Sequence, residues 1–109
     1  MQNTASLDEI QQSINDNAMV LIYFSGRSCG VCTALKPKIE EMLQAFPKIK
    51  SMHVDAEKSQ DIAAYYNFFT IPAVLVFVEG KMTIREARCF SVQELNKGVS
   101  RYYSLLYGE

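Results

Sequence analysis

The sequence contains no tryptophan, one histidine and three cysteines among its 109 residues, and its formal net charge is −1. A nearly neutral chain has no excess of charge to attract nucleic acid or an anionic membrane surface, so neither is expected as a partner. The longest apolar run, Ala18 to Phe24, is far too short to cross a bilayer. Three cysteines are too few for the disulfide scaffold of a small secreted domain.

The amino-terminal segment has neither the basic start nor the apolar stretch of a secretory signal. We therefore expect a cytoplasmic protein. With 49% apolar and 21% charged residues, the composition is that of an ordinary globular chain. A chain of this length can bury its own core, so we expect a single domain over residues 1–109.

Hydrophobic periodicity predicts eight elements in the order α-β-α-β-α-β-β-α. Helices are expected at 7–15, 30–46, 58–67 and from Ser91 onward, and strands at 18–24, 49–55, 74–78 and 81–87. Strands separated by helices imply parallel crossovers, and a tight turn at Glu79-Gly80 makes the last two strands an antiparallel hairpin. We therefore expect an α/β fold, with a four-stranded mixed sheet covered by helices on both faces.

Two cysteines, in the segment Cys29-Gly30-Val31-Cys32, lie where the strand 18–24 leads into a helix. Two intervening residues allow a disulfide across the first turn, and free N–H groups at a helix start stabilise a thiolate. Metal binding is the alternative, but a structural zinc site takes about four ligands. One histidine and one distant cysteine do not complete such a set, except in a site shared between two subunits, so no metal is expected.

The cysteine pair, Pro37 five positions after it, and Thr70-Ile71-Pro72 before a strand and hairpin together resemble the thioredoxin family. The resemblance extends from about residue 18 to the last helix. It implies a thioredoxin-like fold and a thiol–disulfide oxidoreductase that reduces protein disulfides. Cys29 would be the nucleophile and Cys32 the resolving cysteine.

The same resemblance implies a surface for the substrate. Pro72 would follow a cis peptide bond and lie against the disulfide, and the backbone of Ile71 would pair with an extended substrate segment. Gly30 and Val31 would contribute contacts, and Phe69 is expected to be exposed beside this groove. The family implies no bound cofactor, because NADPH would supply electrons indirectly through a thioredoxin reductase.

The chain also departs from the family pattern. Ser28 precedes the first cysteine where classical members have tryptophan, and Val31 replaces the usual proline. Tyr23 stands where the family has a buried aspartate, and the lysine that partners this aspartate aligns near Ser51. The family's opening strand is expected to be missing. These departures leave open a binding module with little turnover, or a redox sensor, as alternatives to an enzyme.

Several further residues allow two interpretations each. Cys89, in a loop near the cysteine pair, is either a small buried hydrophobe or a third thiol able to form a regulatory or mixed disulfide. Arg27 either favours the thiolate of Cys29 or is an ordinary solvated charge. We expect His53 to be structural and Phe68 to pack inside. Tyrosines crowd the final helix, which hints at a weak dimer of an otherwise monomeric protein.

Overall fold

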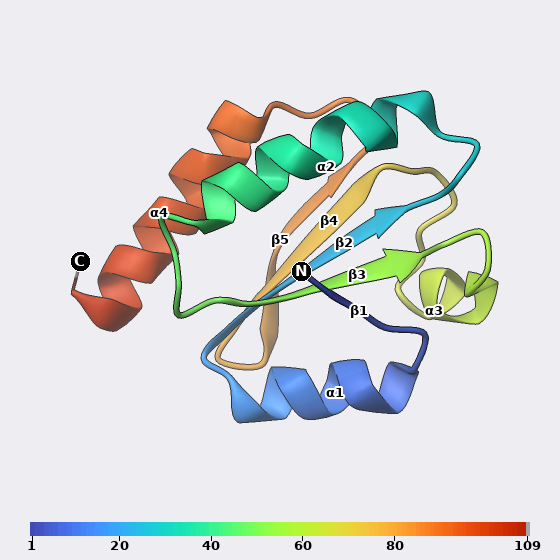
Figure 1. Ribbon diagram of the computed structural model, residues 1–109. Helices are drawn as coiled ribbons and strands as arrows, with labels where there is room; N and C mark the ends of the chain where they lie inside the picture. Colours follow the sequence, from blue (N-terminus) through green and yellow to red (C-terminus); the bar gives the residue numbers. More distant parts are fainter. Residues whose placement is uncertain (109) are drawn as a thin grey trace.

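Five strands form one mixed sheet in the order β1-β3-β2-β4-β5 (Figure 1). The computed structural model describes residues 1–108. The strands are β1 (Gln2–Asn3), β2 (Met19–Ser25), β3 (Lys50–Asp55), β4 (Ala73–Val78) and β5 (Lys81–Ala87), and the helices are α1 (Leu7–Asp16), α2 (Gly30–Leu43), α3 (Gln60–Tyr65) and α4 (Val92–Tyr107). β2 runs parallel to β3 and antiparallel to β4, and β4 and β5 form the predicted hairpin. The predicted α/β class is therefore confirmed.

The prediction of four strands, with the opening strand missing, is wrong. Gln2 and Asn3 form β1 and pair in parallel with β3. Both residues are exposed, so this strand has no buried side chain that periodicity could reveal. Backbone hydrogen bonding holds it instead, and it continues to Thr4, whose N–H donates to the His53 carbonyl at 2.9 Å.

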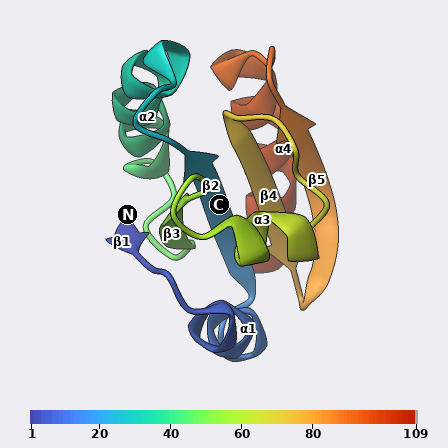
Figure 2. The same ribbon diagram turned by 90° about the vertical axis from the view of Figure 1, so that its right-hand side faces the viewer.

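The side chains of β2 divide the core into two layers. Val20, Ile22 and Phe24 face one layer, into which α1 and α3 pack, whereas the alternate residues face the layer of α2 and α4. Figures 1 and 2 show α1 on the opposite side of the sheet from α2 and α4. Every residue of β2 is buried, as expected for the central strand of a sheet covered on both faces.

Two helices are shorter than their periodicity predicts. α2 ends at Leu43, where a turn begins in which the Phe46 N–H donates to the Leu43 carbonyl at 2.9 Å. Phe46 is still buried, so the apolar pattern continues beyond the helix that produces it. α3 covers only 60–65 of the predicted 58–67. Asn67, expected to terminate this helix, does adopt a left-handed φ of 60°.

Four connecting segments meet one end of the sheet. Ser25 at the end of β2 pairs with Asp55 at the end of β3, and Phe24 pairs with Ala73 at the start of β4. Ala73 also pairs with Ala87 at the end of β5. Segments 26–29, 56–59, 67–72 and 88–91 therefore adjoin the same end, which we call the site end.

Candidate active site

A disulfide joins Cys29 and Cys32, whose Cα atoms are 5.3 Å apart. Cys29 is the N-cap of α2, and its sulfur accepts a hydrogen bond from the Cys32 N–H at 3.1 Å. Cys32 lies in the first turn and is only 2% exposed, whereas Cys29 is half-buried. An approaching sulfur can therefore reach Cys29 but not Cys32.

The two residues between the cysteines face solvent. Val31 is 65% exposed, although it is a large apolar residue. Gly30 is exposed too, and a Cβ added there would meet nothing within 4 Å. Both residues that the resemblance implies as substrate contacts are therefore accessible beside Cys29.

The peptide bond between Ile71 and Pro72 is cis, as the resemblance implies. Pro72 is buried, and its carbonyl accepts a hydrogen bond from the Arg88 N–H at 2.8 Å. No residue of the described chain, 1–108, hydrogen-bonds to the main-chain N–H or C=O of Ile71. These two groups are therefore free to pair with an extended segment of another chain.

Tyr23 lies in the core directly beneath the first turn of α2. Its hydroxyl donates to the Cys32 carbonyl at 2.9 Å, which confirms the prediction of a core aromatic with a hydrogen-bond partner. Burial raises the pKa of Tyr23 to about 12. The phenol therefore stays protonated near neutral pH and cannot act as a base toward the Cys32 thiol.

His53 is the neighbour of Tyr23 on β3. The two rings stack with their centroids 5.7 Å apart. One ring nitrogen of His53 pairs with the Ser25 hydroxyl, and the other lies 2.9 Å from the Asn3 side-chain oxygen. Burial is the largest cause that lowers the pKa of His53, followed by a nearby lysine. These contacts confirm the structural role expected for His53.

No sequence pattern indicates Glu57, yet it contacts the active-site loop. Its carboxylate accepts hydrogen bonds from the Ser28 hydroxyl and, at 3.3 Å, from the Ser28 N–H. The bonds from Ser28 are the largest causes that lower the pKa of Glu57. The side chain also lies over Gly26, where a Cβ would come within 2.6 Å of the Glu57 Cδ. A carboxylate from the β3–α3 loop thus holds the residue that precedes Cys29.

The loop before the cis bond carries two phenylalanines in opposite environments. Phe68 is 4% exposed and Phe69 is 84% exposed, which confirms both predictions. Arg85 of β5 donates to the carbonyls of Tyr66 and Asn67 at 2.7 and 2.8 Å. Its guanidinium also lies 3.9 Å from the centre of the Phe68 ring. Arg85 therefore fixes the chain that leads into Ile71.

Cys89 is a free, exposed thiol at the site end, so its interpretation as a buried hydrophobe is wrong. It follows Arg88, which adopts a left-handed φ of 65°, and so the chain leaves β5 at a sharp turn before Cys89. The interpretation as a third thiol remains. Arg27 is exposed in the segment just before Cys29.

Within residues 1–108, no three histidine, cysteine, aspartate or glutamate side chains gather closely enough to hold a metal ion. The described helices include none with the length and apolar character needed to cross a membrane.

Comparison with known proteins adds to this geometry. A family model described as Thioredoxin matches residues 2–101. The chain belongs to the thioredoxin family. The thioredoxin-like protein YdfQ of Bacillus subtilis is 34% identical over 109 residues, which cover 100% of this chain and 97% of that protein. A thioredoxin of Mycoplasmoides gallisepticum is 28% identical over 97 residues, or 89% of this chain and 97% of the relative.

Solved thioredoxin structures confirm the thioredoxin-like fold. The oxidized form of mitochondrial thioredoxin 3 from Saccharomyces cerevisiae matches with a TM-score of 0.83 and 22% identity, covering 93% of this chain and 94% of that one. Thioredoxin from Fasciola hepatica matches with a TM-score of 0.85 and 22% identity, covering 94% and 99%. Membership of the thioredoxin family, together with the cysteine pair, supports thiol–disulfide oxidoreductase activity in general.

Proposed function

We propose that the protein reduces disulfides in other proteins through Cys29 and Cys32. The observation that carries this proposal is the asymmetry of the pair, an accessible cysteine at the start of α2 bonded to a buried one. The helix start favours negative charge on Cys29 once the disulfide is reduced, and the thiolate is the nucleophilic form.

The reaction proceeds in two exchanges. The Cys29 thiolate attacks one sulfur of the substrate disulfide, the substrate S–S bond breaks, and the departing sulfur leaves as a thiolate that takes up a proton. The deprotonated Cys32 sulfur then attacks Cys29. The Cys29–Cys32 bond forms, and the second substrate sulfur leaves as a thiolate. Two electrons pass to the substrate, and the protein is left in the oxidised form described above.

The substrate segment binds as an added strand. The free N–H and C=O of Ile71 pair with its backbone, next to the buried Pro72. The exposed Gly30, Val31 and Phe69 contact its side chains. Pairing through the main chain suits a reductase with many substrates, because every extended segment presents the same backbone groups.

Recycling requires an external reductant. We infer that a flavin-containing thioredoxin reductase passes electrons from NADPH to the Cys29–Cys32 disulfide, and that the protein itself carries no bound cofactor. This electron transport would operate in the cytoplasm and contribute to redox homeostasis there.

One observation favours a second function, a binding module that recognises extended segments at Ile71 with little turnover. Tyr23 occupies the position of the family's buried acid and stays protonated, so it cannot assist deprotonation of Cys32. The variant Cys32→Ser separates the two functions. A reductase with this change accumulates mixed disulfides through Cys29, whereas a binding module releases its partners unchanged.

The main test combines an insulin-type reduction assay with equilibration of the cysteine pair in graded glutathione buffers. A reductase is expected to turn over insulin and to reach equilibrium at a reducing potential. Absence of turnover, or a pair that forms no disulfide at any glutathione ratio, would contradict the proposal. A potential on the oxidising side would instead indicate an oxidase or a sensor.

A further inference from the structure

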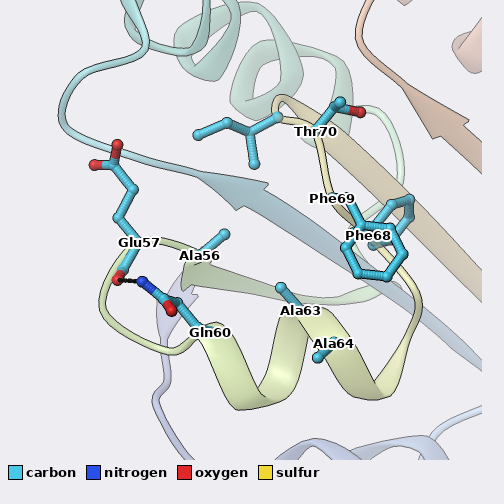
Figure 3. A pocket seen from close by; sticks show the side chains of 9 residues that line it. Ala56, Glu57, Gln60, Ala63, Ala64, Phe68, Phe69 and Thr70 are labelled. Atoms are coloured by element: carbon cyan, nitrogen blue, oxygen red, sulfur yellow. Dashed lines mark hydrogen bonds between the residues drawn. The ribbon is translucent and has the colours of Figure 1, made fainter.

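A groove lies between α3 and the loop that leads to the cis bond (Figure 3). Three alanines form much of its lining, Ala56, Ala63 and Ala64, and their small side chains leave a hollow of about 470 Å³. Phe68 and Phe69 form one wall. This volume lies within the range of ligand-binding pockets.

The groove adjoins the strand-pairing position of the proposed substrate, because Ile71 is one of its lining residues. A segment paired with the main chain of Ile71 sends successive side chains to opposite sides. Those on the α3 side point toward the hollow, and those on the other side do not. The groove can therefore take one side chain from a segment whose cysteine reacts at Cys29.

The lining also indicates the chemistry of the segment. Of the described residues that line the groove, Glu57 alone carries a charge. Figure 3 shows Glu57 across the hollow from Phe68 and Phe69. Its carboxylate accepts two hydrogen bonds from Ser28, but a carboxylate has about four acceptor positions, so it can accept a further donor. An apolar side chain suits the phenylalanine wall, and a basic side chain suits the opposite rim.

We propose that this groove selects disulfide-bearing protein segments that place one large apolar side chain against Phe69 and a basic residue near Glu57. The selection rests on the proposed reductase function and adds a substrate class to it. Burial of an aromatic side chain contributes about tenfold to kcat/KM. The exposed ion pair at Glu57 contributes about threefold.

The test uses short peptides whose single cysteine is disulfide-bonded to thionitrobenzoate, which absorbs light when released. A phenylalanine replaces alanine at each position around the cysteine in turn, and lysine is then compared with glutamate beside it. The wild-type protein is expected to prefer phenylalanine at one position and lysine next to it. Equal rates for all peptides would overturn the proposal.

Variants locate this preference in the groove. Ala64→Trp fills the hollow, and Phe69→Ala removes the exposed ring of the phenylalanine wall. Both variants are expected to lose the preference for phenylalanine. Tyr65→Ala is the matched control, because Tyr65 is an exposed aromatic of α3 that does not line the groove. It is expected to keep the preference. A preference that survives Ala64→Trp would place the selecting surface elsewhere and refute the proposal.

Dithiobis-nitrobenzoate has the same leaving group and no peptide, so it reports the chemistry without the groove. Tyr65→Ala is expected to react with it at the wild-type rate, and the peptide rates of Ala64→Trp and Phe69→Ala are each divided by that variant's own rate with this reagent. If the wild-type protein reacts with neither reagent nor peptides, the reductase function fails. Anisotropy of labelled peptides with serine in place of cysteine then tests the groove alone. Tighter binding of the phenylalanine peptide, lost in Ala64→Trp, would support the groove, and equal binding would overturn it.

Discussion

The end of the sheet that faces away from Cys29 is closed by its own hydrogen bonds. Glu79 and Gly80 form the tight turn between β4 and β5, with φ values of 51° and 81°. The Glu79 N–H donates to the Ala18 carbonyl at 2.8 Å, so the hairpin is tied to the start of β2. The chain enters β2 past Asn17, whose side chain donates to the Ser13 carbonyl at 2.8 Å.

The site end has the opposite character. The main chain of Ile71 has no hydrogen-bond partner within the described residues, and Val31 and Phe69 expose large apolar surfaces. Free polar groups and exposed apolar side chains add nothing to folding, because their contacts with water are about as good in the unfolded chain. The two ends share the buried β2, so the groups that the site end leaves open are held in place by contacts elsewhere in the fold.

Loss of the cysteines is expected to have the largest effect on exchange and little effect on the sheet. Cys29→Ser removes the only accessible sulfur of the pair and is expected to lower disulfide reduction at least about a thousandfold. Cys32→Ser keeps the first exchange and stops the second, so mixed disulfides accumulate. Mass spectrometry without reductant measures them. Normal turnover in Cys29→Ser would mean that another sulfur, such as Cys89, starts the reaction.

A substitution at Tyr23, which lies between the core and the site, separates an effect on stability from an effect on the reaction. Tyr23→Phe removes the hydroxyl that donates to the Cys32 carbonyl and is expected to lower the free energy of unfolding by about 1.5 kcal/mol. Because the phenol is no base, the pH dependence of the second exchange is expected to keep its shape. Urea unfolding and stopped-flow rates measure the two effects. A shifted pH profile would show that the phenol takes part in proton transfer.

A substitution at the closed end is expected to affect stability and not activity. Gly80→Ala places a Cβ on a residue with a φ of 81° and is expected to lower the free energy of unfolding by about 1 kcal/mol. Insulin reduction by the folded variant is expected to match that of the wild type, since the turn is remote from Cys29. Reduced insulin turnover by the fully folded variant would show that the two ends are not independent.

The smallest expected effect is a pH dependence at His53. Burial, followed by Lys36, lowers the pKa of His53 in the folded protein, so the unfolded chain binds the proton more readily. Stability is therefore expected to fall as the pH drops through about 6.5, the ordinary histidine value, and to level off below the folded pKa. Urea midpoints across this range measure it. His53→Gln is expected to remove this part of the slope, and equal slopes would contradict the assignment.

Features that depend on residues close together in the chain could be predicted from the sequence. The strongly apolar β2, the hairpin at Glu79-Gly80 and the helix start at Ser91 each follow from residues close together in the chain. The same is true of the cysteine pair at a strand–helix junction. Opposite environments for Phe68 and Phe69 could also be predicted, because only one of two adjacent side chains in the loop after α3 can face the core.

Features that depend on the register between neighbouring strands, or on contacts between distant residues, could not be predicted from the sequence. Which β3 residue lies beside Tyr23 is decided by the register, and only the structure shows that it is His53. The contact between Glu57 and Ser28 joins residues 29 positions apart and has no periodic signal. β1 lacks a buried side chain altogether, so only its backbone pairing reveals it.

The outer strands determine how the protein behaves when it is concentrated. An open sheet margin is a template on which further chains can add and grow into fibres. One margin here is β1, two residues long, and the other is β5, which carries Lys81, Arg85 and Glu86. The pairing of β4 with β5 also shifts register between Val76 and Phe77. A further strand would find only two residues to pair with along β1, or would have to bury the charged side chains of β5. We therefore expect the chain to remain unaggregated in concentrated solution.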